Sequence, residues 1–347
     1  MKIMISNDGP TAHYYIRKGW AQAFTYAGHD TVIWNINEKP AFEAFSEFEP
    51  DILITQTYNL NRAIIKNIEA RPNMFVAMRT GENSEYSDLN KTKYPILNAN
   101  EDQISLIREL RESCGQPSFL FSHYYQDEIN ITHSRWIDDG FKVVGLMNAA
   151  NLFDYVKGHE QEKYKTDLCF VGGYWPYKAI TLDKYILPLC SGKYKIRIFG
   201  NQPWNTNKYY GFLPQTEERH VLKSAKICLN VHELHSQELG YDVIERPFKL
   251  ISNKCFVISD YVTRLNRMFP EMPMGKTPEE FEKLIDFWIK DEQEDEKRAI
   301  IDRQYKKVLE KHTYFDRCKE IFDSFGLRGL GQDMINKKQE MIERAKL

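Results

Sequence analysis

Short apolar segments alternate along the chain with amphipathic segments, and this alternation limits the fold more than any other feature of the sequence. In the first half, the apolar runs cover residues 2–6, 31–36, 51–55, 74–78, 118–122 and 141–147. A helix is predicted between the first two runs. Its apolar residues share one helical face: Ile16, Trp20, Phe24 and Ala27. Gly28 follows as a stop signal. Strands that alternate with helices indicate parallel sheets with crossover connections.

The same pattern starts again after a polar, charged segment, residues 151–165, which is a plausible linker. The later apolar runs cover residues 166–173, 194–200, 225–231 and 254–260. A chain of 347 residues is long enough for two domains with separate cores. The sequence therefore predicts an α/β protein with two Rossmann-like domains that face a cleft.

Composition excludes several broad classes of protein. The chain has 47 basic and 49 acidic residues, so no gross charge excess points to nucleic acid or membrane as a partner. The six cysteines are scattered without a CxxC pair, which is typical of core thiols in a reducing compartment. No run of about 18 apolar residues occurs, and the N-terminus does not resemble a signal peptide. We expect a cytoplasmic protein without a membrane span.

The segment FVGGYWPYK, residues 170–178, places two glycines at the end of a predicted buried strand. In parallel sheets, ligands bind beyond the carboxyl ends of the strands. Gly172 and Gly173 allow positive φ or close approach of a ligand to the backbone, and Lys178 adds a cation. If a helix begins near Tyr177, its N-terminus favours a phosphate. The alternative is a tight turn followed by a surface lysine.

Further residues of the second half could bind the same ligand. Asn201 follows a predicted strand, and backbone atoms of Phe212 and Leu213 could contact the edge of a base. Arg246 and Lys249 lie one helical turn apart, a spacing that suits a diphosphate. The alternative for these two cations is a pair of salt bridges with nearby acidic residues, Glu245 and Asp242.

The predicted sheet ends of the first half offer candidates for a general base. Asp8 and His13 flank a turn after the first strand, and Glu82 follows the fourth. Each of them could equally be a helix cap or a hydrogen-bonded structural residue. His232 and His235 are too few, and wrongly spaced, for a metal site, so no metal is predicted.

The segments DLCFVGGYW, IRIFGN, YYGFLP and ERPFKLISNKCFVIS occur in the order and spacing of the GT-B glycosyltransferases. The chain resembles the spore-maturation-type branch and the phage glucosyltransferases that modify hydroxymethylated DNA bases. The resemblance covers most of the chain and is clearest between residues 166 and 260. It implies an acceptor domain, residues 1–155, a donor domain, residues 156–310, and C-terminal helices, residues 311–347, that return to the first domain.

The resemblance also implies roles for the residues described above. Gly172 and Gly173 would face the phosphates of a nucleotide-sugar donor, expected to be a UDP-sugar, and Arg246 would hold its diphosphate. Phe212 and Leu213 would flank the base. Glu82 falls where the phage enzymes carry their acidic base. No obligatory cofactor is implied.

Two departures from the family pattern leave questions open. Lys249 stands where the family often has a ribose-binding glutamate, and the E-x7-E pattern of many retaining members is missing. Inversion and retention therefore cannot be distinguished. The acceptor is also open: a glycan, a protein, or hydroxymethylated DNA bound by a lysine rim, residues 163, 165, 193, 195 and 208. The alternatives to transfer are a nucleotide-sugar epimerase or hydrolase, and a non-catalytic nucleotide-sugar-binding protein.

Overall fold

The computed structural model describes residues 1–9, 12–114 and 118–347, and the chain divides into two compact units. The first unit combines residues 1–147 with residues 314–347, and the second unit holds residues 148–313. The polar segment 151–165 therefore belongs to the second unit, and the C-terminal 34 residues, 314–347, belong to the first.

The first unit is built on a six-stranded parallel sheet with the strand order β2-β1-β3-β4-β5-β6. Each strand corresponds to one of the apolar runs in the first half of the sequence. The strands are β1 (Lys2–Asn7), β2 (Asp30–Asn35), β3 (Ile52–Gln56), β4 (Phe75–Arg79), β5 (Ser118–Ser122) and β6 (Val143–Gly145). Because all strands are parallel, their carboxyl ends meet along one edge of the sheet.

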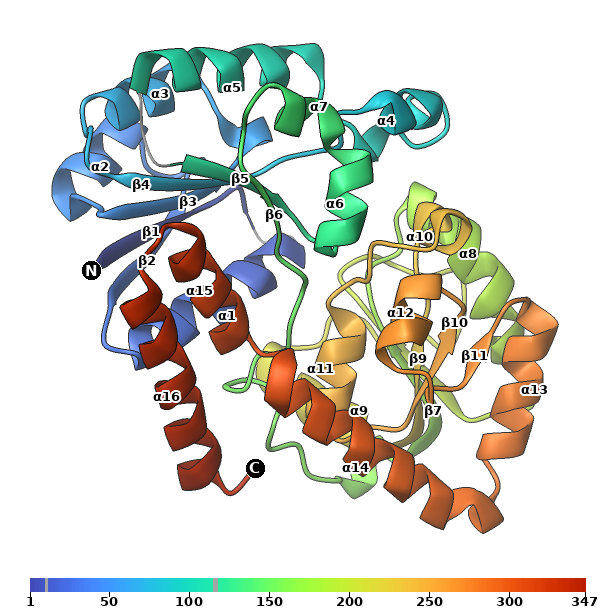
Figure 1. Cartoon of the computed structure of the whole chain (residues 1–347). Coiled ribbons are helices and arrows are strands. Elements are labelled where there is room, and N and C mark those ends of the chain that lie inside the picture. Colours follow the sequence, from blue (N-terminus) through green and yellow to red (C-terminus); the bar gives the residue numbers. More distant parts are fainter. Residues whose placement is uncertain (10–11, 115–117) are drawn as a thin grey trace. The chain divides into compact units, whose positions relative to one another are not determined.

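Helices cover both faces of this sheet (Figure 1). The helices are α1 (Ala12–Tyr26), α2 (Ala41–Phe48), α3 (Arg62–Glu69), α4 (Glu85–Asn90), α5 (Glu101–Cys114), α6 (Gln126–Thr132), α7 (Ser134–Asp138), α15 (Tyr314–Ser324) and α16 (Arg328–Ala345). In Figure 1, α2, α3 and α5 lie on one face, and α1 lies with α15 on the other. Gly19 makes the contact between α1 and α15 possible, because a Cβ atom there would overlap the ring of Tyr314. The C-terminal helices α15 and α16 thus belong to the first unit.

The end of α1 shows how the sequence sets a helix boundary. Gly28 has φ +89°, a left-handed conformation that glycine adopts without a steric penalty. Its N–H donates to Thr25 O at 3.0 Å, and the N–H of His29 donates to Phe24 O at 3.1 Å. These two bonds form a Schellman motif, which satisfies carbonyl groups at the helix end. The predicted stop at Gly28 is confirmed.

The second unit contains a five-stranded parallel sheet with the order β11-β10-β9-β7-β8. Its strands are β7 (Thr166–Val171), β8 (Ile196–Phe199), β9 (Ala225–Asn230), β10 (Val257–Asp260) and β11 (Met274–Gly275). The sequence does not predict β11, because two residues are too few to show a periodicity. The helices are α8 (Pro176–Tyr185), α9 (Gln215–Lys223), α10 (Leu234–Leu239), α11 (Arg246–Ser252), α12 (Thr263–Met268), α13 (Pro278–Trp288) and α14 (Glu294–Lys311).

The core of the second unit forms where its sheet meets the helices. Apolar residues of β7, β8 and β9 pack against α8 and α13 through Leu182 and Phe281, both fully buried. In Figure 1, α11 lies across the sheet from α13 and packs against α14. Cys169, Cys228 and Cys255 are free thiols buried in this unit, in line with the predicted role of cysteine as a small core residue.

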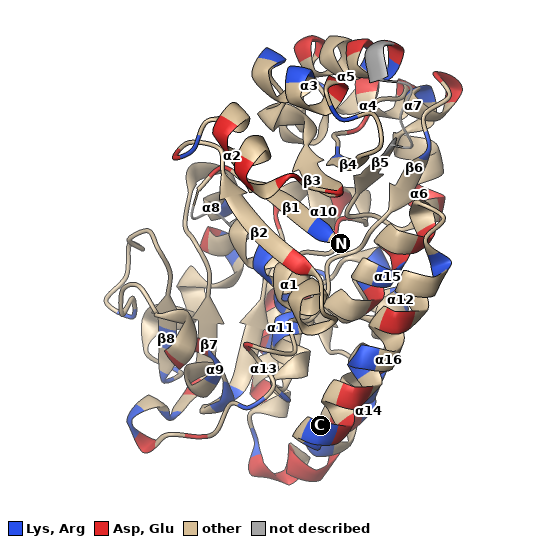
Figure 2. Ribbon diagram, turned by 90° about the vertical axis from the view of Figure 1, so that its left-hand side faces the viewer, with Lys and Arg blue, Asp and Glu red and all other residues tan. Residues whose placement is uncertain are grey.

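The charged segment around the start of α14 is largely exposed, as its composition predicts. Figure 2 shows acidic and basic residues mixed along this helix. Lys297 is an exception, because it is buried and its ammonium lies 2.8 Å from a carboxylate oxygen of Glu294. Among the described helices, none is both long enough and apolar enough to cross a membrane.

Candidate functional site

The glycine turn after β7 lies against the side chain of Arg246. A Cβ atom on Gly172 would lie 2.7 Å from Nη2 of Arg246, and one on Gly173 would lie 2.9 Å from Oδ1 of Asn201. Neither glycine has a positive φ. Close packing, and not a left-handed conformation, is therefore what excludes side chains here. The helix α8 begins at Pro176, one residue before the predicted start near Tyr177.

Arg246 is held rigidly at the carboxyl edge of the second sheet. Its Nε donates to Val171 O at 3.0 Å, and its Nη1 donates to Asn230 Oδ1 and to Val231 O, each at 3.2 Å. The guanidinium also lies over the ring of Phe170, 4.7 Å from its centre. Burial lowers the pKa of Arg246 to about 10, so the group is charged at neutral pH. In the described part of the chain, no carboxylate forms an ion pair with it.

Lys178, in the first turn of α8, is a second buried cation. Only 5% of the residue is exposed, and its ammonium lies 5.0 Å from the ring centre of Trp175. Burial, and then the neighbouring charge of Arg246, lower the pKa of Lys178 to about 7. Within the described ranges it has no ion-pair partner. The alternative of a surface lysine is therefore wrong, because Lys178 is buried and its charge interacts with that of Arg246.

Binding of a diphosphate beside Lys178 should depend on pH. The negative charge of such a ligand raises the pKa of this lysine from about 7, so the complex holds more protons than the free protein. Affinity should then fall as pH rises above 7, by up to about tenfold per pH unit until the pKa of the complex is reached. Isothermal titration calorimetry between pH 6 and 9 measures this slope. The Lys178→Arg variant stays charged throughout, so its slope should be flat above pH 7; equal slopes in both proteins would contradict the prediction.

Lys249 is turned toward a different partner. Its Nζ lies 2.5 Å from Oε1 of the buried Glu218 in α9, and 5.3 Å from the ring centre of Tyr155. The hydroxyl of Tyr155 donates to the other oxygen of Glu218 at 3.1 Å. Lys249 is thus neutralised by an ion pair. The carboxylate partner of Lys249 is therefore Glu218. It is not Glu245 or Asp242, which the sequence offered as partners for these cations.

The two residues predicted to flank the base lie in the turn before α9. Phe212 is 65% exposed, and Leu213 is half-buried. The preceding Gly211 has φ +89°, and its carbonyl accepts a hydrogen bond from the N–H of Gly200 at 3.1 Å. The turn is therefore tied to the end of β8, close in sequence to Asn201.

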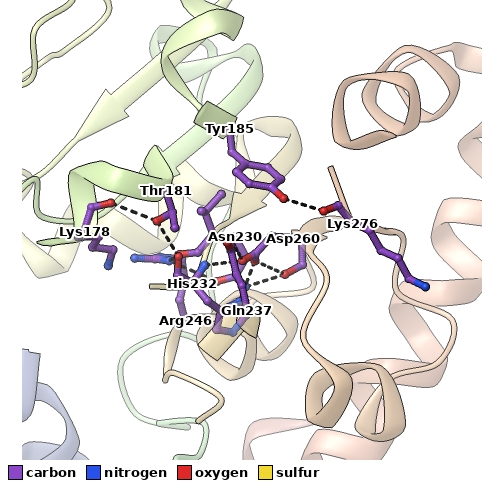
Figure 3. A network of polar contacts seen from close by, with 11 residues as sticks. Lys178, Thr181, Tyr185, Asn230, His232, Gln237, Arg246, Asp260 and Lys276 are labelled. Carbon is purple, nitrogen blue, oxygen red and sulfur yellow. Dashed lines mark hydrogen bonds and ion pairs between the residues drawn. The ribbon is translucent and has the colours of Figure 1, made fainter. Parts of the chain in front are cut away.

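A buried histidine–aspartate pair completes this edge of the sheet (Figure 3). His232 Nδ1 lies 2.7 Å from Asp260 Oδ1, and Asp260 Oδ2 accepts from the His232 N–H at 2.9 Å and from Gln237 Nε2 at 2.7 Å. Asn230, which accepts from Arg246, donates to Ser259 at 2.8 Å. Burial opposes ionisation of Asp260, but His232 and these hydrogen bonds lower its pKa overall.

Sequence reasoning did not find this network. It considered His232 and His235 only as metal ligands, whereas the structure pairs His235 Nε2 with Asp242 at 2.8 Å. The described residues contain no group of three or more side chains suited to a metal. The sequence does contain one signal for this network. Asp260 is the last residue of a buried strand, at the edge of the sheet where ligands bind.

In the first unit, Asp8 and His13 meet at the carboxyl ends of β1, β3 and β4. Asp8 accepts from Arg17 Nη1 and from Gln56 Nε2, each at 3.2 Å. His13 Nε2 lies 2.8 Å from Arg79 Nη1. Burial, and then Arg79 and other cations, lower the pKa of His13 to about 2. His13 is therefore neutral and already accepts a hydrogen bond, which makes it a weak base.

Glu82 lies apart from that cluster. It is 1% exposed and lines a cavity of about 150 Å³ together with residues of α4 and α5 and with Arg135 of α7. Its backbone is paired with the segment after α4, through Leu97 O at 2.8 Å and the N–H of Ala99 at 2.9 Å. The structure thus places the three predicted bases in two sites, Asp8 with His13 and Glu82 alone.

Comparison with known proteins identifies the fold. Residues 184–323 match the sequence family described as glycosyl transferase-like, and no curated protein matches the chain. T4 phage BGT in complex with UDP and Mn²⁺ superimposes with a TM-score of 0.58 at 13% identity, covering 94% of this chain and 99% of that one. An alpha-glucosyltransferase in complex with UDP and a 13-mer DNA containing a HMU base superimposes with a TM-score of 0.58 at 14% identity. The match covers 93% of this chain and 99% of that one.

A third solved structure, S. aureus MnaA with UDP, gives a TM-score of 0.51 at 9% identity, with coverages of 94% and 98%. Identities this low show the fold alone, and the fold is the one implied by the resemblance in sequence. The family match spans β8 to β11 and includes both Arg246 and Asp260. The chain therefore has the GT-B fold, and residues 184–323 are similar to the family described as glycosyl transferase-like.

Proposed function

We propose that the protein is a glycosyltransferase that moves a sugar from a UDP-sugar to a hydroxyl acceptor. The observation that carries this proposal is the pair of buried cations, Lys178 and Arg246, neither of which forms an ion pair with a carboxylate of the described residues. Asp260 and Glu233 attract both charges only from a longer distance. A buried charge without a carboxylate in contact costs free energy. A negatively charged ligand removes that cost. A diphosphate bound beside the glycine turn would supply the negative charge.

The donor would lie along the carboxyl edge of the second sheet. Arg246 offers its charge and the N–H groups of Nη2, because its Nε and Nη1 already donate to the protein, and Lys178 offers a point charge. Because Gly172 and Gly173 carry no side chains, Arg246 and Asn201 lie close against this turn, where they can bind the phosphates. Phe212 is exposed and available to the base, and Leu213 follows it. We assign Lys249 to its ion pair with Glu218 and not to the diphosphate.

In the proposed reaction, the acceptor oxygen forms a bond to the anomeric carbon as the bond from that carbon to the β-phosphate oxygen breaks. UDP leaves with the bonding electron pair, and the two cations stabilise the charge that grows on it. The acceptor proton passes to a carboxylate of the first unit, for which we propose Asp8 because its side chain is partly exposed. The two cations offset the charge of the diphosphate, so we expect transfer without an obligatory metal.

Hydroxymethylated DNA remains one candidate acceptor, because an alpha-glucosyltransferase of similar fold is in complex with such DNA. Three of the five lysines in the rim suggested by the sequence do not favour DNA. Lys163, Lys165 and Lys193 form surface ion pairs with Glu217, Glu162 and Glu282, at 3.6, 2.8 and 3.0 Å. These pairs reduce the attraction of the rim to phosphates of the DNA backbone.

Donor turnover tests the proposal. The protein is incubated with UDP-, GDP-, dTDP- and CMP-sugars, and nucleotide release is followed by mass spectrometry, with an arm in EDTA. We expect slow release of UDP from one sugar donor, unchanged by EDTA and faster with a suitable acceptor. Rapid turnover with no acceptor would favour a hydrolase or epimerase. Binding of UDP with no turnover under any acceptor would favour a nucleotide-sugar-binding protein, and no binding would refute the proposal.

A further inference from the structure

A second group of cations lies at the carboxyl ends of β1, β3 and β4 in the first unit. Arg17 and Arg79 line a small cavity of about 20 Å³, together with Gln56 and the two histidines His13 and His123. This cavity is separate from the one that Glu82 lines. It lies at the edge of the sheet where parallel α/β folds bind their ligands.

The charges around this cavity do not balance. Arg17 is compensated by Asp8, with 3.2 Å between Nη1 and Oδ1. Arg79 contacts two neutral groups, His13 Nε2 at 2.8 Å and the hydroxyl of Tyr58 at 2.9 Å. No carboxylate within the described residues forms an ion pair with Arg79. One positive charge is therefore in excess.

Two buried polar atoms of the cavity lining also lack partners in the described structure. Arg79 Nε is a donor without an acceptor, and Gln56 Oε1 is an acceptor without a donor. Gln56 is 1% exposed, and its Nε2 already donates to Asp8. Buried polar groups are normally hydrogen-bonded, so these two atoms mark a place that a ligand completes. The missing partners are an acceptor for the guanidinium and a hydroxyl for the amide oxygen.

We propose that the first unit binds an acceptor with a phosphate or carboxylate group next to the hydroxyl that receives the sugar. The anionic group binds Arg79, and the hydroxyl donates to Gln56 Oε1 or to the neighbouring carboxylate of Asp8. That this ligand accepts a sugar rests on the proposed function. The presence of an anion site in the first unit does not. The cavity of about 20 Å³ holds about one water-sized group, so only the end of a compact anionic group enters it, and a nucleobase does not fit.

Binding of small polyols tests this proposal without any donor sugar. Glycerol 3-phosphate, glycerate and glycerol are titrated calorimetrically into protein saturated with UDP, which occupies the donor cations. We expect one or both anions to bind at least tenfold more tightly than glycerol. Comparing the phosphate with the carboxylate identifies the preferred group. Equal binding of all three compounds would overturn the proposal.

Variants then locate the anion. Arg79→Gln should weaken binding of the preferred anion about tenfold or more, because hydrogen bonds to charged groups contribute more than neutral ones. Arg79→Lys should retain part of the affinity for the anion, because lysine keeps the positive charge. Arg344→Gln, an exposed arginine of α16 paired with Glu340, is the matched control and should change nothing. Unchanged anion affinity in folded Arg79→Gln would overturn the proposal even if donor turnover is observed. Lost turnover with normal anion binding would instead count against the proposed function.

Discussion

Replacing Arg246 by alanine should lower the affinity for UDP by about 100-fold or more. Each hydrogen bond to a charged group contributes about 1.5–3 kcal/mol, and the guanidinium can offer more than one to a diphosphate. Arg246→Lys keeps the charge but loses the planar fork, so we expect an intermediate loss of about tenfold. Calorimetric titration with UDP measures both variants against the wild type.

Stability must be separated from binding in this experiment. The hydrogen bonds of Arg246 to Val171 and Val231 connect the ends of β7 and β9, so the alanine variant will also be less stable. The midpoint of thermal unfolding shows whether it is folded at the titration temperature. Arg298→Ala removes an exposed arginine of the same unit, paired with Glu294 at 3.3 Å, and should bind UDP normally. Near-normal UDP binding by folded Arg246→Ala would remove the main support for the donor site.

The strands of both sheets could be predicted because each is a short apolar run in a parallel sheet covered on both faces. Such strands are buried on both sides, so their sequences are apolar throughout. The end of α1 was equally clear, because Gly28 is needed for its positive φ. The two-residue strand β11 carries no such pattern. Its pairing depends on β10, where the N–H of Ser259 donates to Pro273 O at 3.0 Å, a contact between residues distant in sequence.

The site could be predicted only where sequence neighbours are also neighbours in space. The glycine turn and Lys178 lie within one segment of the sequence. Helical spacing correctly puts Lys249 one turn from Arg246, but it could not reveal Glu218, which α9 brings to that lysine. The pairing of Arg79 with His13 joins residues 66 positions apart. Spacing cannot predict contacts of this kind, because they depend on the order of strands in the sheet.

Asp8 and Glu82 are both carboxylates near sheet ends, and burial distinguishes them. The side chain of Asp8 is 27% exposed, whereas Glu82 is 1% exposed as a residue. A general base must come within hydrogen-bond distance of the acceptor hydroxyl. Asp8 also shares its cluster with the arginine that has no carboxylate partner. These observations favour Asp8, although the resemblance in sequence pointed to Glu82.

Asp8→Asn should therefore lower kcat by about 10²- to 10⁴-fold and leave the affinity for UDP unchanged. Asparagine has the same shape and can still accept from Gln56, but it cannot take the acceptor proton. Arg17 loses its counterion in this variant, so the unfolding midpoint should be measured beside the rate. Glu82→Gln is the matched control and should change kcat only a few-fold. If Glu82→Gln abolishes transfer while folded Asp8→Asn remains active, the base is Glu82, and the Asp8 cluster serves the acceptor only through its charge.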